Sequence, residues 1–185
     1  MRLFVALELS EAVRAALAEL VGRLQRTSAD IRWARPEGMH LTLKFIGEVA
    51  AEKLPRLREA LGQVPRPGPV ELDFSGLGYF PSERRPRVLW VGVRASSNLA
   101  ELAVQVETTL EPLGIPCEKR AYVPHLTLGR FRSASRLARL QEEIARLPAT
   151  EFGRFQAKEF ILFESRLSPR GAEYSKLEHF PLVRP

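Results

Sequence analysis

A chain of 185 residues with 45% hydrophobic and 27% charged residues has the composition of a globular protein and is long enough to bury a core. It has no apolar run of the roughly 18 residues needed to cross a bilayer, and its single cysteine excludes an internal disulfide. The formal net charge of +6 favours an anionic partner, most commonly nucleic acid, but charge alone does not identify a reaction. An acidic residue, Glu8, comes too early for a signal peptide, so we expect a cytoplasmic protein.

The first half of the chain alternates between strand and helix patterns. An apolar run over residues 3–9 predicts a strand, and Ser10 is a good N-cap for the helix that follows. In that helix, predicted over 11–25, Val13, Leu17 and Leu24 belong to a set of apolar residues at helical spacing. The later patterns predict strands over 31–34, 40–46 and 70–80, a helix over 51–61, a Pro-rich loop over 64–69 and a charged turn over 81–86.

The same order of patterns begins again near residue 88. Strands are predicted over 88–93, 125–131, 155–164 and 172–178, and helices over 97–110 and 134–147. Residues 88–93 follow residues 4–9 by 84, and residues 156–163 follow residues 71–78 by 85. Any α+β protein can be aligned with itself by sliding, so this order alone is weak support for a duplication.

The tetrapeptide His-Leu-Thr-Leu occurs twice, over residues 40–43 and 125–128, and contains two of the three histidines. The copies are 85 residues apart, which favours an ancient duplication with pseudo-two-fold symmetry. The strands and helices predicted within one half lie too close together in the sequence for that half to be a complete domain. We therefore expect a single α+β domain over residues 1–185, in which two interlocked lobes from sequence halves of about 1–86 and 87–185 share one cleft.

Each copy of the motif pairs an imidazole with a hydroxyl. Side chains two apart on a strand point to the same face, so the histidine and threonine share one face while the leucines supply the buried one. Imidazole can donate or accept a proton near neutral pH. A lone histidine on such a strand is more often structural, but the duplication favours His40 and His125 as catalytic residues. Two imidazoles and two hydroxyls suit metal-free acid–base chemistry on an oxyanion such as a phosphate.

Three other kinds of site are weaker. Catalytic zinc usually takes at least three protein ligands, and the chain has no H-E-x-x-H motif and no cysteine cluster, while the third histidine, His179, lies near the end. Cys117 follows Pro116 in an expected loop, which disfavours a nucleophilic pair of Cys117 with His125. A Gly-rich phosphate loop and a dinucleotide fingerprint are both absent from the sequence. We expect neither a metal nor a cofactor.

The contexts of the two motifs, GMHLTLKFIGEV over 38–49 and YVPHLTLGRF over 122–131, resemble those of the 2H phosphoesterases. The strands over 2–6 and 86–92 strengthen this match. Within the superfamily, nearly the whole chain is similar to the bacterial and archaeal RNA 2′,3′-cyclic phosphodiesterases, historically called 2′-5′ RNA ligases. The resemblance implies a bilobal α+β fold of duplicated β-α-β units. Two mainly antiparallel sheets would flank a central cleft, with helices outside and the motif strands side by side at the cleft floor.

The resemblance also implies an activity, the hydrolysis of a terminal RNA 2′,3′-cyclic phosphate to a 2′-phosphate. By carry-over, His40 is the general acid and His125 the general base, although the residues alone leave these roles interchangeable. Thr42 and Thr127 would donate hydrogen bonds to the non-bridging oxygens. Run backwards, the site would join a 5′-hydroxyl to a cyclic phosphate and give a 2′-5′ linkage without ATP. The expected partner is an RNA or nucleotide with a cyclic phosphate end, with no membrane partner and a monomer as the default.

The family places a stacking aromatic and a phosphate-binding arginine five residues after the histidines, at Phe45 and Arg130. Strict alternation conflicts with this, because an odd step leads to the opposite face of a strand. A regular strand favours Lys44 instead, whereas a bulge near Gly47 or beside Gly129 would re-aim both side chains. The alternatives are that Phe45 is a core aromatic and that Arg130 is a solvated arginine.

A function of another class is a non-catalytic nucleotide- or RNA-binding module of the same fold, because the superfamily includes members of that kind. The intact histidines and threonines of both motifs favour an enzyme. Turnover of an RNA ending in a cyclic phosphate, measured in EDTA, distinguishes the two functions.

Overall fold

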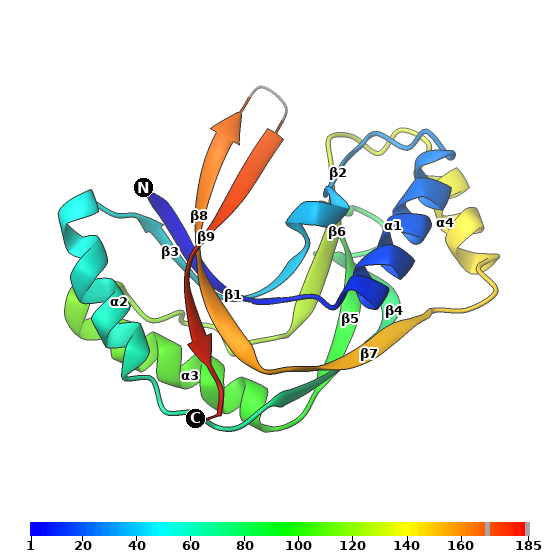
Figure 1. Ribbon diagram of the computed structural model, residues 1–185. Coiled ribbons are helices and arrows are strands. Elements are labelled where there is room, and N and C mark those ends of the chain that lie inside the picture. Colours follow the sequence, from blue (N-terminus) through cyan, green and yellow to red (C-terminus); the bar gives the residue numbers. More distant parts are fainter. Residues whose placement is uncertain (169–170, 184–185) are drawn as a thin grey trace.

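Two antiparallel β-sheets form the centre of the computed structural model, which describes residues 1–168 and 171–183. The first sheet has the strand order β3-β1-β8-β9 and the second has the order β2-β6-β5-β4-β7 (Figure 1). The strands are β1 (Arg2–Glu8), β2 (Ile31–Trp33), β3 (His40–Glu48), β4 (Val70–Phe80), β5 (Val88–Ala95), β6 (His125–Phe131), β7 (Glu151–Ala157), β8 (Glu159–Ser168) and β9 (Gly171–Pro181). The α+β class with two antiparallel sheets, expected from the sequence, is confirmed.

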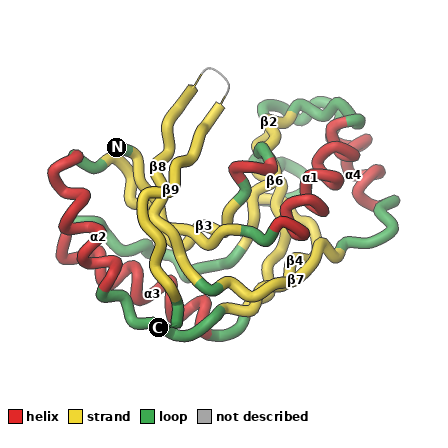
Figure 2. Tube along the Cα trace, viewed as in Figure 1, coloured by secondary structure: helices red, strands yellow, loops and turns green. Residues whose placement is uncertain are grey.

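The helices lie outside the two sheets (Figure 2). They are α1 (Glu11–Gln25), α2 (Leu54–Gly62), α3 (Asn98–Leu110) and α4 (Leu137–Ala145). Helices α2 and α3 pack against each other and against β9 and β3 of the first sheet, while α1 packs against β7 of the second sheet and against α4. Among the described residues, no helix is long and apolar enough to cross a membrane.

Helix α1 has the bounds that the sequence predicts. The hydroxyl of Ser10 accepts a hydrogen bond from the backbone N–H of Val13 (3.3 Å), which caps the helix. Helices α2 and α4 are shorter than predicted. A 3-10 turn over 51–53 precedes α2, which has Pro55 in its first turn. Helix α4 begins after Arg136, whose backbone is left-handed with φ of 58°.

Each sheet takes strands from both halves of the sequence. In the first sheet β1 pairs with β8, and in the second sheet β5 pairs with β4 and β6 pairs with β2. Helices are exchanged in the same way, since α3 follows β5 in the chain but packs against β3, and α1 follows β1 but packs against β7. Neither sheet is therefore built from one half of the sequence alone.

One predicted strand is two strands in the structure. The sequence predicts a single strand over 155–164, but β7 ends at Ala157, β8 begins at Glu159, and the two belong to different sheets. The break falls at the exposed Lys158, whose carbonyl accepts a hydrogen bond from the N–H of Leu182 (2.8 Å). No glycine or proline marks this position, so the sequence carries no turn signal there.

The number of residues between equivalent positions of the two halves is not the same for every strand. In the first sheet Phe163 pairs with Phe4, and in the second Phe80 pairs with Val88. The equivalent residues of β8 and β4 are therefore 83 apart (163 − 80), and the expected offset of 85 for this segment is wrong. A register shift in β4 between Ser75 and Leu77 contributes to the difference.

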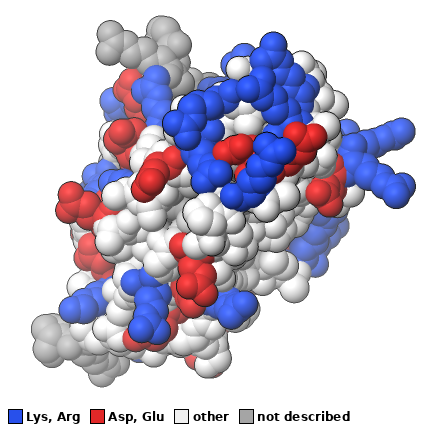
Figure 3. Space-filling model, turned by 90° about the vertical axis from the view of Figure 1, so that its right-hand side faces the viewer, with Lys and Arg blue, Asp and Glu red and all other residues white. Residues whose placement is uncertain are grey.

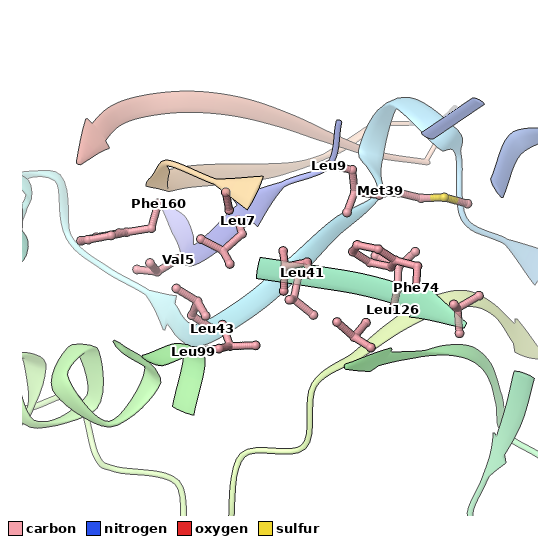
Figure 4. Close-up of a cluster of buried hydrophobic side chains, with 14 of the residues drawn as sticks. Val5, Leu7, Leu9, Met39, Leu41, Leu43, Phe74, Leu99, Leu126 and Phe160 are labelled. Carbon is pink, nitrogen blue, oxygen red and sulfur yellow. The ribbon is translucent and has the colours of Figure 1, made fainter. Parts of the chain in front are cut away.

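The two motif strands share one hydrophobic core. Leu41 of β3 and Leu126 of β6 point into one cluster of buried side chains that includes Phe74 of β4 (Figure 4). All four motif leucines are buried, namely Leu41, Leu43, Leu126 and Leu128. The expectation that they supply the buried face is confirmed. A separate buried cluster, of Phe4, Ala6, Ile161 and Phe163, lies on the other face of the first sheet.

Candidate active site

The pairing of β3 with β1 explains how Phe45 shares a face with His40. The pairs are His40–Glu8, Thr42–Ala6 and Phe45–Phe4. Because their β1 partners are two residues apart, all three β3 side chains lie on one face of the sheet. Leu43 is the extra residue of a β-bulge between the pairs made by Thr42 and Lys44, and this bulge converts the odd step into an even one.

The second motif strand has the same irregularity at the same place. The pairs between β6 and β5 are His125–Gly92, Thr127–Trp90 and Arg130–Val88. Leu128 is the extra residue, so Arg130 lies on the face of His125 and Thr127. Leu43 and Leu128 are 85 residues apart (128 − 43), like the histidines. We call these the inner faces of the two sheets: His40, Thr42 and Phe45 in the first, and His125, Thr127 and Arg130 in the second.

Lys44 does not lie on the inner face, and the expectation that a regular strand would favour it is wrong for this strand. The bulge at Leu43 turns Lys44 toward the core, where its side chain is 2% exposed. Its Nζ lies 2.7 Å from Oε2 of Glu107 in α3 and donates a hydrogen bond to the carbonyl of Pro116 (2.6 Å). Phe45, in contrast, is 60% exposed, so it is not a core aromatic.

Aromatic rings surround His40. Phe4 stacks on the imidazole with a centroid distance of 4.5 Å, Phe163 lies 5.9 Å away in a near-parallel orientation, and Tyr174 approaches edge-on at 5.0 Å. Burial among these groups disfavours the imidazolium and lowers the pKa of His40 to about 4, although a hydrogen bond with the backbone of Gly38 partly opposes this shift. His40 is therefore neutral at pH 7 in the free protein.

His125 has a fixed tautomer. Its Nδ1 lies 2.9 Å from the carbonyl oxygen of Val123, and because a carbonyl only accepts, Nδ1 must carry the hydrogen. In the neutral ring Nε2 is then the nitrogen that can take up a proton. Phe80 meets this imidazole edge-on at 5.1 Å and lies 5.1 Å from Trp90.

A hydrogen bond connects the two motifs. The hydroxyl of Tyr122, three residues before His125, donates to the carbonyl of Thr42 (2.9 Å), and burial raises the pKa of this phenol. Strands β3 and β6 also contact each other although they belong to different sheets. Together with the shared leucine core, these contacts fix the position of one motif relative to the other.

A cavity of about 450 Å³ adjoins His125 on the inner face of the second sheet. Strands β4 and β5 contribute its floor, and the segment before β6 and the loop before β7 contribute its walls. Its lining includes Phe80, Trp90, His125, Asp73, Arg94 and Glu151.

The aromatic surroundings of both histidines were not predicted from the sequence. These residues are Phe4, Phe163 and Tyr174 at His40, and Phe80 and Trp90 at His125. All five lie on strands, where alternation shows that they share a face with some neighbours but not which sheet or histidine they meet. The strand order, which the sequence does not specify, is the missing information.

Other candidate chemical groups lie in different settings. Partial burial and the carboxylates of Glu111 and Glu107 raise the pKa of the Cys117 thiol, which disfavours a thiolate nucleophile. The third histidine, His179, is exposed, and its Nδ1 lies 3.0 Å from Oε1 of Glu159. Within residues 1–168 and 171–183, no group of three or more His, Cys, Asp and Glu side chains is arranged to hold a metal ion.

A family model described as LigT like phosphoesterase matches the chain twice, over residues 7–90 and 91–174. The chain belongs to the LigT-like phosphoesterase family. The double match confirms the duplication inferred from the repeated tetrapeptide. It also confirms the resemblance to the 2H phosphoesterases that rests on the motif contexts.

Relatives of this LigT-like phosphoesterase cover nearly its whole length. The RNA 2′,3′-cyclic phosphodiesterase of Archaeoglobus fulgidus is 34% identical over 180 residues, which are 97% of this chain and 99% of the relative. That of Methanothermobacter thermautotrophicus is 34% identical over 182 residues, 98% of each chain.

Solved structures show the same architecture. A crystal structure of a protein from Thermus thermophilus has a TM-score of 0.81 and 34% identity, and the match covers 98% of both chains. The structure of Escherichia coli LigT complexed with 3′-AMP has a TM-score of 0.78 and 26% identity, and the match covers 99% of this chain and 98% of that one.

Proposed function

We propose that the protein hydrolyses the 2′,3′-cyclic phosphate at the end of an RNA to a 2′-phosphate without a metal ion. The observation that carries this proposal is the register of the two motif strands. In each strand the histidine, the threonine and the residue five after the histidine share one face because of the same bulge. Full-length relatives that are RNA 2′,3′-cyclic phosphodiesterases support the choice of substrate.

In the proposed reaction, Nε2 of His125 takes a proton from a water molecule, whose oxygen attacks the phosphorus. The bond between phosphorus and O3′ breaks, and His40 gives its proton to O3′, which leaves the phosphate on O2′. The bond of Nδ1 of His125 to the Val123 carbonyl leaves Nε2 unprotonated in the neutral ring, as a base requires. His40 makes an equivalent bond with the backbone of Gly38, so the proposed assignment of acid and base follows the family resemblance and not this bond. Thr42 and Thr127 donate hydrogen bonds to the non-bridging oxygens as negative charge builds up there.

His40 must be charged to act as the acid, although its pKa of about 4 makes it neutral in the free protein at pH 7. A phosphodiester bound beside the ring supplies a negative charge, which favours the imidazolium and raises the pKa of His40 in the complex. The substrate therefore helps to protonate its own acid. The pH dependence of kcat reports the pKa of His40 in the complex, and that of kcat/KM reports its pKa in the free protein. We therefore expect kcat to stay high up to a higher pH than kcat/KM does.

Exposed groups suit a nucleotide and a polyanion. The ring of Phe45 is available for stacking on a base, and the guanidinium of Arg130 is available for a phosphate oxygen. Basic side chains also gather on the side of the molecule that α1 and α4 cover (Figure 3). The exposed arginines of these elements, of β2 and of the adjoining loops are Arg26, Arg32, Arg132, Arg136, Arg139 and Arg146.

The test is to incubate the protein in EDTA with an oligoribonucleotide that ends in a 2′,3′-cyclic phosphate and to identify the product. We expect a 2′-phosphate from the wild type and a loss of at least about a hundredfold in rate for His40→Ala and for His125→Ala. The variant His179→Ala removes the remaining histidine, which lies against Glu159, and should keep wild-type activity. Full activity in either motif variant would contradict the mechanism.

Two further outcomes point to other functions. Abolition of activity by EDTA would indicate a metal-dependent reaction. Binding of the cyclic-phosphate RNA without turnover in the wild type would indicate a nucleotide- or RNA-binding module. The proposed reverse reaction, which joins a 5′-hydroxyl RNA through a 2′-5′ linkage, is measured with the same cyclic-phosphate RNA and an added acceptor strand.

A further inference from the structure

The space beside the two histidines differs. Glu8 lies opposite His40 in the pairing of β1 with β3. Its carboxylate accepts hydrogen bonds from Nζ of Lys176 (2.6 Å) and Nη2 of Arg14 (3.2 Å). Although burial raises the pKa of Glu8, these two cations hold it below its usual range, so an ion-pair network occupies this position. Opposite His125 stands Gly92, and here the cavity of about 450 Å³ opens.

Glycines shape this cavity. Gly76 is the bulged residue of β4, with φ of 72°, and lies in the cavity wall. Gly92 has no space for a side chain, because a Cβ there would lie 2.6 Å from the carbonyl oxygen of Ser75. A Cβ on Gly78 would overlap the indole of Trp90, so this glycine lets the Trp90 ring lie against the backbone of β4.

The lining of the cavity is suited to a nucleoside. Phe80 and Trp90 offer aromatic surfaces on which a base can stack. The Nε1–H of Trp90 is buried and has no acceptor among the described residues. The carboxylates of Asp73 and Glu151 can accept hydrogen bonds from the amino group of a base. Among the described residues that line the cavity, Arg94 is the only lysine or arginine, so the two carboxylates disfavour a phosphate there.

We propose that this cavity binds the nucleoside that carries the 5′-hydroxyl when the protein joins two RNA ends. The inference rests on the proposed function, in which His125 takes the proton from the attacking oxygen. In hydrolysis that oxygen belongs to water, but in joining it is O5′ of an incoming nucleoside, which must therefore lie beside His125. The cavity is on that side, and its two carboxylates select a free 5′-hydroxyl over a 5′-phosphate.

The joining step balances without a nucleoside triphosphate. The bond between O5′ and phosphorus forms while the bond between phosphorus and O3′ breaks. The proton of the 5′-hydroxyl goes to His125, and His40 supplies the proton that O3′ takes up. The product is a 2′-5′ phosphodiester with a free 3′-hydroxyl, and the reverse step uses the same cavity for the departing nucleoside.

The experiment compares two reactions in the same variants. Thr150 lines the cavity but is exposed on the loop before β7, so Thr150→Trp should obstruct the cavity without affecting the core. Its neighbour Ala149 is also exposed but does not line the cavity, which makes Ala149→Trp the matched control. We expect Thr150→Trp to slow the joining of a 5′-hydroxyl oligonucleotide about tenfold or more, because the obstructed cavity can no longer stack one base. Hydrolysis of a 2′,3′-cyclic mononucleotide should stay within about twofold.

The results separate the two proposals. If the wild type hydrolyses the cyclic mononucleotide but Thr150→Trp joins as fast as Ala149→Trp, the cavity is not the acceptor site and the proposed function stands. An equal loss of both reactions in Thr150→Trp would also overturn the inference. If the wild type hydrolyses nothing, the proposed function fails first.

A binding measurement does not depend on any variant of the loop. Adenosine, which has a 5′-hydroxyl and an amino group on its base, should quench the tryptophan fluorescence of the wild-type protein in a saturable way, and uridine should do so more weakly. In Trp90→Phe the remaining tryptophan, Trp33, should show no saturable quenching. Equal quenching in wild type and Trp90→Phe, or none in the wild type, would overturn the inference.

Discussion

The strands β3 and β6 have the same backbone geometry but different surroundings. In both, the motif histidine and threonine pair with alternate residues of a neighbouring strand, and a bulge at the last motif leucine brings the residue five after the histidine onto the same face. The backbone therefore does not distinguish the two histidines. Their differences come from the side chains placed around them.

Three pairs of equivalent residues carry these differences. They are Glu8 and Gly92 opposite the histidines, Ala6 and Trp90 opposite the threonines, and Lys44 and Gly129 after the bulges. As a result His40 lies within an aromatic enclosure beside an ion-pair network, whereas His125 lies at a cavity. The two histidines therefore have similar backbone settings but different neighbouring side chains, which fits the opposite roles of acid and base proposed for them.

The buried Lys44 gives the largest expected effect on stability. Its partner Glu107 is 15% exposed, so Lys44→Ala leaves a carboxylate without a counter-charge inside the protein. We expect the free energy of unfolding, measured with urea, to fall by about 3–5 kcal/mol. The double variant Lys44→Met/Glu107→Leu removes both charges and should recover most of this loss. Lys53→Ala, at an exposed lysine, should change stability by less than about 0.5 kcal/mol.

The enclosure of His40 predicts a dependence of stability on pH. The pKa of His40 is 6.5 in the unfolded chain and about 4 in the folded protein, so the unfolded chain binds more protons between these values. Stability should therefore fall as the pH falls from 6.5 to 4, by about 3 kcal/mol from this group. Urea unfolding at pH 7 and pH 4 should show that His40→Gln loses less stability on acidification than the wild type does. An equal loss in both proteins would mean that His40 is not held neutral by burial.

The residues five after the histidines should act on different kinetic constants. Arg130→Ala removes the proposed donor to the phosphate and should lower kcat for cyclic-phosphate hydrolysis by about a hundredfold. Phe45→Ala removes a stacking surface worth about 1–3 kcal/mol and should mainly raise KM. Arg56→Ala, at an exposed arginine of α2, is the control and should affect neither constant strongly. If Phe45→Ala lowered kcat as much as Arg130→Ala, the division of roles between the strands would be wrong.

Much of the site could be predicted from the sequence because its signal is local. The repeated tetrapeptide and the alternation of a strand place histidine and threonine on one face, and the leucines on the other. The odd step to Phe45 and Arg130 pointed to a bulge, but at Gly47 or Gly129 rather than at Leu43 and Leu128. A leucine carries no local signal for a bulge, because this irregularity depends on the pairing with β1 and β5.

The pairing of distant strands is what the sequence could not supply. Nothing in residues 155–164 indicates that the chain leaves one sheet for the other at Lys158. Without that exchange, Phe163 has no visible relation to Phe4 or His40, although the three stack in the structure. Local patterns gave helix α1 and strand β4 their bounds because those elements depend on their own apolar periodicity.

The counterpart of Lys44 in the second strand, Gly129, gives the smallest expected effect. It is buried where β2 pairs with β6, and a Cβ there would overlap Cγ2 of Ile31 and lie 3.2 Å from the carbonyl oxygen of Arg32. Gly129→Ala must therefore displace the short strand β2, and we expect a loss of about 1–3 kcal/mol in the free energy of unfolding.

Gly62→Ala is the matched control for this variant. A Cβ at Gly62 meets open space in helix α2, so the change should be neutral or slightly stabilising. Because Arg32 of β2 pairs with Arg130, displacement of β2 should also disturb the inner face, and Gly129→Ala should lower the rate of hydrolysis while Gly62→Ala does not. If Gly129→Ala were as stable and as active as Gly62→Ala, β2 would yield without strain. The missing side chain at position 129 would then not be needed for β2 to pair with β6.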